Sequence, residues 1–481
     1  MSAMLGAKLA LARTVGAVSR LRGGGGTSLP GKLLMRIDPS AVGALAARLP
    51  EGSVLVSATN GKTTTAAIAS SILERAGVSL VHNQAGANMA GGIASTLLAA
   101  AGPHGAIAGE LGLFEVDELW LDRLAAELHP RVVVLGNLFR DQLDRYGELD
   151  TIADRWAAAV HGGAAAAARL VCNADDPLVA DLAREAPEVI YYGVEDDSLA
   201  LEGIAHAADA THCRRCGTPY TFDAVYLGHL GHYRCSTCAQ RRPSPTVIAR
   251  AVALEGVRSA RFHLFTPGGD AEVKLALPGL YNVYNALAAA ALAVALDVPF
   301  DDIVAGLEST KAAFGRAETL SVNGRQTRIL LVKNPAGANE VLRTLAIEPG
   351  MHDLLGALND KTADGHDVSW IWDADFELLA GRIRLATCTG TRAAELALRL
   401  KYAGVEPERI RVIDDLPQAL SSAAAERPGG AGLAVDRSGL SAANRSSVGE
   451  DAPLYVLPTY TAMLALRELL VRRGEASSSW R

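Results

Sequence analysis

The chain has 481 residues, more than one ordinary domain, so two or three domains are expected. It is 49% hydrophobic and 21% charged, a composition typical of soluble α/β proteins that excludes a disordered or fibrous chain. The formal net charge of −7 supplies no positive surface field, so a nucleic-acid partner is not expected.

The N-terminal segment, residues 1–48, begins with a basic and weakly amphipathic stretch, MSAMLGAKLALARTVGAVSRLRGGGG. Lys8 and Arg13 interrupt any signal-peptide core, and the chain has no apolar run long enough to cross a bilayer, so neither export nor a spanning helix is expected. Two interpretations stay open, a helix docked on the first domain and a contact with the membrane surface. We expect a cytoplasmic protein, with association at the inner face of the membrane under the second interpretation.

An apolar strand followed by a Gly-Lys-Thr turn occupies residues 54–65, VLVSATNGKTTT. The continuous apolar residues are typical of a strand buried on both faces. Strand, turn and helix in this order form a phosphate cradle, in which Lys62 reaches the outer phosphates and the Thr63 hydroxyl ligates Mg²⁺. The sequence therefore predicts an ATP site. Its candidate binding residues are Asn60, Gly61, Lys62, Thr63 and Thr64.

The string ATNGKTTT resembles the P-loop of the Mur ligase superfamily. Members of this superfamily activate a carboxylate as an acyl phosphate and capture it with an amine. The usual superfamily string is TGTNGKT, and Ala58 replaces its first glycine here. This replacement requires a negative φ at Ala58.

Short apolar runs alternate with helical stretches after the P-loop, which predicts a parallel, doubly wound sheet. Helices are expected notably at residues 116–128 and 152–160, and a later helix runs to Leu296. The expected strands are residues 105–109, 131–137, 168–177, 188–194, 247–254 and 260–265.

Two groups of polar residues follow these strands. Glu115 follows the strand expected near Ile107, and a carboxylate there is the expected second Mg²⁺ ligand, matching the Mur position. Asp117 and Glu118 alternatively charge the first turn of the next helix. Asn137, Asp141 and Asp144 resemble the N-x-x-x-D-H segment of Mur ligases, with Gln142 in place of histidine. The second metal site is therefore left open.

Four cysteines in two C-x-x-C pairs, separated by eighteen residues, predict a zinc ribbon inserted at about residues 211–243. Four thiolates leave no open position on the ion, so the zinc is expected to be structural. His212, His229 and His232 are expected to face solvent, and Gly217 and Gly231 to supply the turns. The predicted ligands are Cys213, Cys216, Cys235 and Cys238.

Two further segments resemble Mur ligase motifs. In LYNVYNALAAA, Asn282 and Asn285 match the segment that contacts the adenine edge. In FGRAE, Arg316 matches the arginine that reaches the phosphates across the interdomain cleft. These motifs end a central ATP-binding domain, residues 49–315, and precede a smaller, Rossmann-like α/β domain, residues 316–474, with a tail at 475–481.

The second domain opens with VKNPAGANEVL, similar to the Mur "DYAHNP" opening but with Lys333 in place of histidine. The segment ALNDKTADGHDVSWIWD, residues 357–373, then places several acidic residues beside aromatic ones. With the zinc ribbon, this segment resembles the MurT family, the ATPase subunits of lipid II isoglutaminyl synthases.

The resemblance implies amidation of the α-carboxyl of D-glutamate in the lipid II stem peptide, as a step of peptidoglycan synthesis. An acyl phosphate would form at Lys62 and Glu115, with Mg²⁺ at Thr63 and Glu115. Ammonia would come from a class I glutaminase partner of the GatD type, as a heterodimer. Cys172 and Cys388 are interpreted as core residues. Asp364 or Asp367, with Asp360 also open, would complete the partner's catalytic triad.

Two alternatives stay open. One is a self-sufficient Mur or folylpolyglutamate-type ligase that adds an amino acid without a partner. The other is a zinc-ribbon scaffold that holds ATP as a structural ligand only, which the intact Lys62, Thr63 and Glu115 argue against. The stoichiometry and the preferred lipid II variant are not specified by the sequence.

Overall fold

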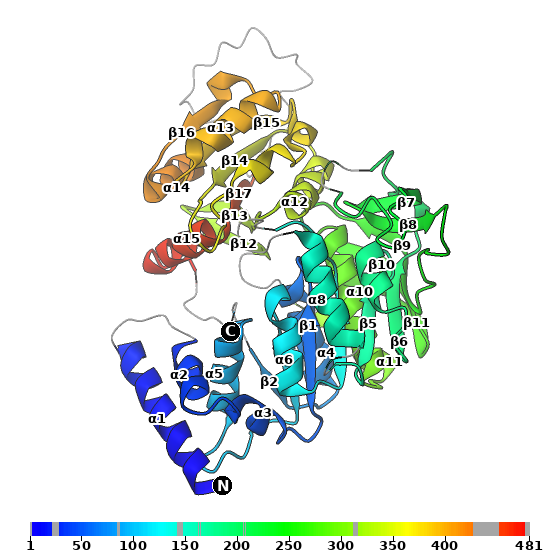
Figure 1. Cartoon of the computed structure of the whole chain (residues 1–481). Helices are drawn as coiled ribbons and strands as arrows, with labels where there is room; N and C mark the ends of the chain where they lie inside the picture. The colour runs from blue at the N-terminus through cyan, green and yellow to red at the C-terminus, as the bar shows by residue number, and fades with distance from the viewer. Residues whose placement is uncertain are drawn as a thin grey trace.

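Two sheets, each covered by helices on both faces, organise the protein in the computed structural model (Figure 1). The first sheet has nine strands and the second has six among the residues that the structure describes. None of the described helices is both long and apolar enough to span a bilayer. The structure describes residues 2–21, 28–83, 87–141, 148–161, 163, 165–204, 206, 208–310, 316–426 and 452–476.

The first sheet is parallel from β2 to β9 and ends in two antiparallel strands, so the predicted parallel sheet is confirmed for most of its width. Alternation of side chains along β1 explains why the strand is apolar throughout: Val54 and Val56 face one helical layer and Leu55 the other. In sheet order the strands are β11 (Gly269–Leu275), β10 (Ala260–Thr266), β9 (Val247–Leu254), β6 (Val189–Val194), β5 (Arg169–Asn173), β4 (Val132–Leu135), β1 (Ser53–Ser57), β3 (Leu111–Glu115) and β2 (Leu80–His82).

Helices cover the two faces of the first sheet. One face packs against α4 (Lys62–Arg75), α10 (Leu280–Ala295) and α11 (Phe300–Ser309). The N-terminal helices join the other layer through Leu9, Leu34 and Val42, as a docked segment requires. That layer comprises α1 (Ser2–Leu21), α2 (Leu29–Ile37), α3 (Ala41–Ala46), α5 (Ala90–Ala100), α6 (Leu121–Leu128), α8 (Leu149–His161) and α9 (Pro177–Leu182), with the short turn η1 (Glu118–Trp120). The short turn η2 (Asp197–Leu199) packs against the opposite layer through Leu199.

The strand predicted at residues 105–109 is wrong. The chain forms β3 at Leu111–Glu115 instead, and Ile107 makes only an isolated bridge to Ala101. Gly105 and Gly109 have φ of +82° and +149°, a turn conformation that breaks a regular strand. Glu115 nevertheless ends a strand, as expected.

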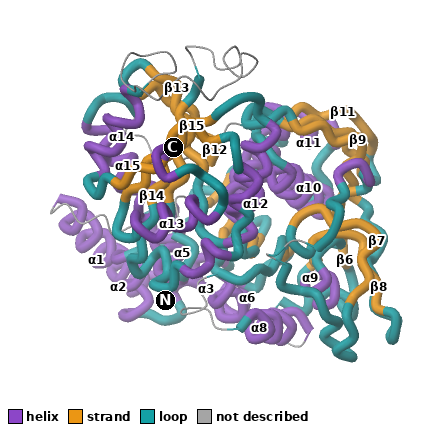
Figure 2. Tube along the Cα trace, turned by 90° about the horizontal axis from the view of Figure 1, so that it is seen from above, coloured by secondary structure: helices purple, strands orange, loops and turns teal. Residues whose placement is uncertain are grey.

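A separate two-stranded sheet, β7 (Tyr220–Leu227) and β8 (Leu230–Cys235), is inserted in the connection between β6 and β9. Figure 2 shows this hairpin at the edge of the first domain, beside β6. Gly217 has φ of +70°, as predicted for the first cysteine knuckle. The prediction for Gly231 is wrong, because the hairpin turn uses Gly228, with φ of +58°.

The second sheet belongs to the C-terminal half and is parallel except for the β12–β13 hairpin. Its faces are covered by α12 (Pro335–Ile347) and α13 (Ala393–Tyr402) on one side, and by α14 (Leu416–Ala425) and α15 (Tyr460–Arg472) on the other. In sheet order the strands are β12 (Arg316–Val322), β13 (Arg325–Leu330), β17 (Leu454–Pro458), β14 (His352–Ala357), β15 (Ile383–Thr389) and β16 (Ile410–Val412); the remaining turns are η3 (Ser369–Trp372), η4 (Phe376–Leu379) and η5 (Pro407–Arg409).

Candidate active site between the two sheets

The turn between β1 and α4 has the geometry of a phosphate cradle. Gly61 precedes the first residue of α4 with φ of +90°, and a Cβ at this position would overlap Oδ1 of Asn285. Glycine is therefore required by both the backbone conformation and the close approach of α10. Ala58 is not among the described residues with positive φ, so its replacement of the usual glycine is tolerated.

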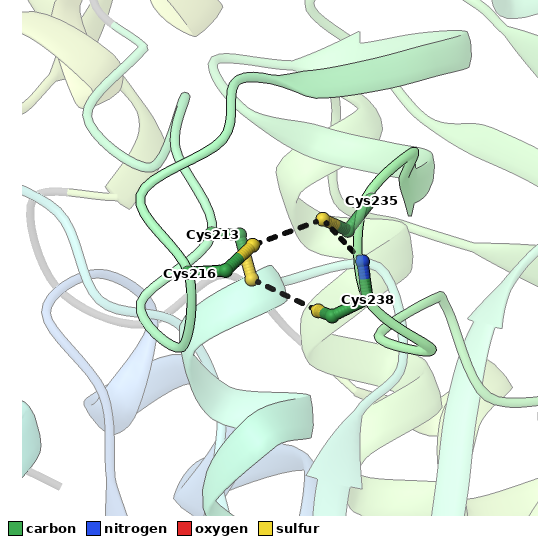
Figure 3. Close-up of side chains that lie close together, drawn as sticks. All are labelled: Cys213, Cys216, Cys235 and Cys238. Carbon is green, nitrogen blue, oxygen red and sulfur yellow. Dashed lines mark hydrogen bonds between the residues drawn. The ribbon is translucent and has the colours of Figure 1, made fainter.

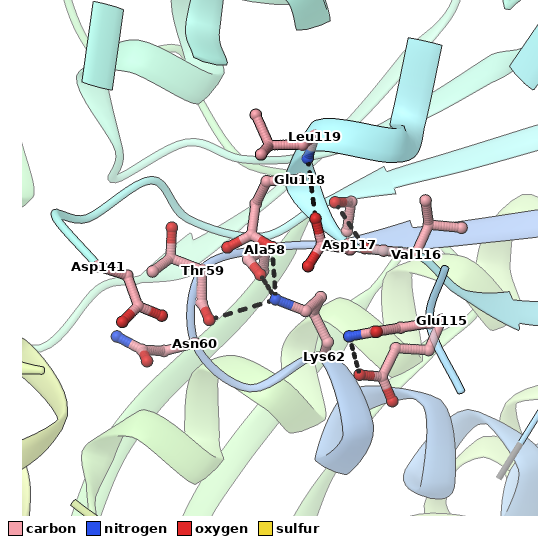
Figure 4. A network of polar contacts seen from close by, with 12 residues as sticks. Ala58, Thr59, Asn60, Lys62, Glu115, Val116, Asp117, Glu118, Leu119 and Asp141 are labelled. Carbon is pink, nitrogen blue, oxygen red and sulfur yellow. Dashed lines mark hydrogen bonds and ion pairs between the residues drawn. The ribbon is translucent and has the colours of Figure 1, made fainter. Parts of the chain in front are cut away.

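Lys62 is buried at the N-terminus of α4 (Figure 4). Its Nζ lies 2.8 Å from Oε2 of Glu118 and also donates to the carbonyl oxygens of Ala58 and Thr59. Burial lowers the pKa of Lys62, but the carboxylates of Glu118, Glu115 and Asp117 outweigh it, so the pKa is raised and the ammonium is retained. Glu118 therefore balances the charge of Lys62, a role beyond the expected interaction with the first turn of the next helix.

Thr63 and Glu115 lie side by side, with the Thr63 hydroxyl donating to Oε2 of Glu115 at 2.8 Å. Asn83 fixes the Glu115 backbone, since its side chain bonds both the N–H and the C=O of that residue at 2.8 Å. Asn88 lies 3.4 Å from Oε1 of the same carboxylate. A hydroxyl and a carboxylate at a P-loop are the oxygen donors that Mg²⁺ prefers, so these residues fit the ion. Asn83 belongs to no recognised motif, so nothing in the sequence indicated this role.

The loop after β4 lies against the P-loop. Asn137 accepts from the Asn60 N–H at 2.9 Å and donates to the Asn60 carbonyl at 3.0 Å, which ties the two loops together. The N–H of Phe139 donates to the Thr59 hydroxyl at 3.0 Å. Asp141 is buried beside them. Gln142 and Asp144 lie outside the described residues.

The two asparagines predicted at the start of α10 are both buried near the P-loop. Asn285 accepts from the Thr65 hydroxyl at 3.3 Å and donates to Asn282 at 3.1 Å, while Asn282 donates to the Pro278 carbonyl at 2.7 Å. Asn285 thus lies beside the phosphate turn, and a contact of either residue with adenine stays a prediction. Thr64, also predicted, is buried in the first turn of α4. Arg316 begins β12, but its side chain lies outside the described part of the structure.

The second domain reaches the same loop. Asn334 caps α12 by accepting from the Gly337 N–H, and it exchanges side-chain hydrogen bonds with Asn60 at 3.0 and 3.3 Å. Lys333 donates to the Thr59 carbonyl at 3.1 Å and to the Asp141 carboxylate. The sequence marked Lys333 as unusual but gave no signal that Asn334 would contact the P-loop.

Three of the four aspartates in the 357–373 segment are the candidates for the partner's triad, and they have different surroundings. Asp364 is buried, and both oxygens accept from Thr461, one of them from its N–H at 2.7 Å, in the first turn of α15. Asp360 pairs with Arg392 and the Thr391 hydroxyl. Asp367 is exposed, and hydrogen bonding to Ser369 lowers its pKa, so its carboxylate is ionised at neutral pH. Asp367 is the most exposed of these three, since Asp364 is buried and the Asp360 side chain is 29% exposed.

The four predicted cysteines converge at one end of the inserted hairpin (Figure 3). Their sulfur atoms all lie within 4.8 Å of one another. A tetrahedral zinc with Zn–S bonds of about 2.3 Å separates its sulfur ligands by about 3.8 Å, so this group fits the ion. The cluster comprises Cys213, Cys216, Cys235 and Cys238.

The prediction that His229 faces solvent is wrong. It lies at the hairpin tip, is fully buried and packs against Phe139 with ring centroids 4.5 Å apart. Its Nε2 is 3.5 Å from Asp176, the N-cap of α9. His212 is exposed, as predicted, and His232 is partly buried. The hairpin tip therefore packs against the loop after β4, whose Phe139 N–H bonds the Thr59 hydroxyl of the P-loop.

Comparison with known proteins places these features in a family context. The Mur ligase middle domain matches residues 56–236 and the MurT ligase C-terminal domain matches residues 331–435. The subunit MurT of lipid II isoglutaminyl synthase (glutamine-hydrolyzing) from Staphylococcus aureus (strain N315) is 34% identical over 82% of this chain and 87% of its own. The corresponding subunit from Streptococcus pneumoniae (strain ATCC BAA-255 / R6) is 32% identical over 95% and 94%.

Solved structures show the same fold. A pseudomurein peptide ligase type C from Methanothermus fervidus superposes with a TM-score of 0.62 at 23% identity, covering 89% of this chain and 80% of that one. Folylpolyglutamate synthase from Mycobacterium tuberculosis, complexed with ADP and AMPPCP, gives 0.58 at 16% identity, covering 89% and 94%. The Mur ligase-like fold predicted from the P-loop string is confirmed.

We predict one tightly bound zinc per chain, detectable by elemental analysis of protein purified without chelator. Cys213→Ser should remove the ion and lower the melting temperature by about 5 °C or more, because the metal links two turns that have little core of their own. Ser236→Ala, an exposed change between two of the cysteines, is the matched control. Metal-free protein of normal stability would contradict the site.

We also predict that Lys62→Ala lowers ATP hydrolysis by about 10²-fold or more, since its charge is needed on the transferred phosphate. Lys401→Ala, which removes an exposed charge on α13, should leave turnover unchanged. Circular dichroism checks that each variant is folded. Undiminished turnover in the folded Lys62 variant would refute the ATP site.

Proposed function

This chain belongs to the MurT family of Mur ligase-related proteins, and we propose that it is the ATP-dependent ligase subunit of a lipid II isoglutaminyl synthase in peptidoglycan synthesis. The observation that carries the proposal is the cluster of Lys62, Thr63 and Glu115 at the P-loop, in a chain similar over almost its whole length to subunits of that name. A P-loop lysine beside a metal-binding hydroxyl and carboxylate suits phosphoryl transfer from ATP.

The reaction has two steps. An oxygen of the D-glutamate α-carboxylate attacks the γ-phosphorus of ATP, the bond to the β–γ bridging oxygen breaks, and ADP leaves with that electron pair. Ammonia then attacks the acyl carbon of the resulting acyl phosphate. The C–O bond breaks, inorganic phosphate leaves, and the nitrogen loses a proton to give the amide of D-isoglutamine. Because the carboxylate is first converted to an acyl phosphate, the group that leaves the acyl carbon is phosphate and not an oxide ion.

The residues of the P-loop region would divide the work of the first step. Lys62 would move from Glu118 to the outer phosphates, where a cation stabilises the charge of the transition state. Asn60 and Gly61 would present backbone N–H groups to the phosphates, as a loop at a helix N-terminus does. Mg²⁺, held by Thr63 and Glu115, would neutralise phosphate charge when bound.

The ammonia would come from a glutaminase partner, because the described part of the chain offers no credible nucleophile for glutamine. Cys172 and Cys388 are buried in the two cores. Burial raises the pKa of Cys388 to about 12 and that of Cys172 further, so neither forms a thiolate at neutral pH. The partner fitting this chemistry is a class I glutaminase with its own cysteine and histidine, as in GatD-type subunits.

Asp367 is the residue we propose to complete the partner's triad. It is exposed and ionised, whereas Asp364 is committed to Thr461 and Asp360 to Arg392. An aspartate that orients a histidine and stabilises its charged form is the third member of such triads. Trp372, half exposed just beyond it, meets Tyr402 edge to face and supplies an apolar surface for docking.

The substrate class and location follow from the same proposal. Lipid II is a lipid-linked precursor, so the enzyme would work at the inner face of the membrane from the cytoplasm. Lys32 and Arg36 on α2 are exposed and form a basic surface that suits anionic headgroups. The self-sufficient amino-acid ligase is the second candidate. Its support is that the chain has the fold of folylpolyglutamate synthase. Other ligases have this fold too, so the fold does not favour this candidate over the first.

We predict that Asp367→Asn removes glutamine-dependent amidation by the two-subunit complex while ammonium-dependent amidation is spared. The asparagine keeps the shape but cannot stabilise a charged histidine, so a loss of about 10²-fold or more is expected. Asp364→Asn should act differently, lowering the melting temperature because it weakens the start of α15. Full glutaminase activity in the Asp367 variant would exclude it as the donor, and glutamine hydrolysis by the isolated chain would overturn the partner requirement.

A further inference from the structure

Two lysines from different domains converge on one oxygen of the P-loop. The carbonyl oxygen of Thr59 lies 3.4 Å from Nζ of Lys62 and 3.1 Å from Nζ of Lys333. Lys62 comes from α4 in the first domain, and Lys333 from the connection between β13 and α12 in the second. The two ammonium groups therefore lie close together at the phosphate turn.

Each ammonium group is balanced by a carboxylate. Glu118 pairs with Lys62 at 2.8 Å, and Asp141 pairs with Lys333. Burial raises the pKa of Glu118, and the charges of Lys62 and Lys333 both oppose this rise, so Glu118 interacts with both lysines. Two cations held this close repel unless anions lie between them. A phosphate at the P-loop could take the place of these carboxylates beside both lysines.

Lys333 is held in this position by its neighbour. Asn334 exchanges two side-chain hydrogen bonds with Asn60 and caps α12, so the backbone beside Lys333 is fixed relative to the phosphate turn. The Lys333 side chain is 26% exposed, so the residue is only partly buried between the two domains. A surface lysine that contributes only to solubility would not need a neighbour that is bonded both to Asn60 and to the start of α12.

We propose that Lys333 is a second catalytic lysine, delivered by the second domain, that contacts the γ-phosphate of ATP during its transfer to the carboxylate. This inference rests on the proposed ATP-dependent ligase function. Lys62 approaches the phosphates from the helix and Lys333 from the opposite domain, so together they flank the transferred group. Lys333 stays protonated and only stabilises charge, while the bond between the γ-phosphorus and the bridging oxygen breaks and ADP keeps the electron pair.

The test compares nucleotides with and without a γ-phosphate. Lys333→Met should bind Mg-ADP within about 2-fold of the unmodified protein but bind Mg-AMP-PNP about 10-fold or more weakly, measured by calorimetry. Ammonium-dependent amidation should lose about 10²-fold in kcat. Lys333→Arg, which keeps the charge, should recover most of the AMP-PNP affinity. Lys401→Met, the matched charge removal on α13, should change neither.

If Lys333→Met weakened the binding of Mg-ADP and of Mg-AMP-PNP equally, the proposal would be overturned, because the lysine would then act only as a contact between domains. Unchanged AMP-PNP affinity and unchanged kcat would overturn it as well. Failure of the unmodified protein to bind either nucleotide would overturn the proposed function itself, and with it the role of Lys333. If the unmodified protein binds both nucleotides, a negative result with Lys333→Met counts against the role of Lys333 and leaves the proposed function standing.

Discussion

A buried positive charge constrains the rest of the site. The ammonium group of Lys62 is removed from water in the first turn of α4, and such a group is costly to bury unless charges and dipoles surround it. Glu118 supplies the charge, and the carbonyl oxygens of Ala58 and Thr59 supply the dipoles. The carboxylate and the carbonyl oxygens reach the lysine because β1 and β3 are parallel neighbours and end at the same edge of the sheet. A phosphate can then replace the carboxylate without a new desolvation of the lysine.

The inserted hairpin contributes to this arrangement from a distance. Its cysteine cluster lies at one end, while its tip places His229 against Phe139, whose N–H bonds the Thr59 hydroxyl of the P-loop. Arg242, just after the cluster, bonds Asp175 and Glu195 at 2.6 Å and anchors the returning chain to the sheet. A metal that orders the hairpin would therefore also order the floor of the nucleotide site, without contacting it.

Polar contacts between the domains occur at the P-loop and near the surface segment that we propose for the partner. Asn60 and Asn334 join at the P-loop, and Arg140 in the adjacent loop pairs with Asp209 and lies 3.6 Å from Asp373. Asp373 follows the aromatic turn that begins two residues after Asp367. Asn60–Asn334 and Arg140–Asp373 are thus two separate polar contacts between the first domain and the second, and Asp373 lies close in the chain to the proposed triad aspartate.

The sequence by itself determined the local features: the P-loop, the four cysteines, Glu115 at a strand end and most strands, because each depends on residues close together in the chain. It failed at residues 105–109, where glycine conformation overrode an apolar run, and at His229, whose burial depends on a hairpin folding back onto Phe139. Only the tertiary structure decided that Lys333 and Asn334 meet Thr59 and Asn60, and that Asp364 is committed to Thr461 while Asp367 is free to face a partner. These pairings join residues about a hundred or more positions apart, and no local pattern encodes which distant backbone a side chain will meet.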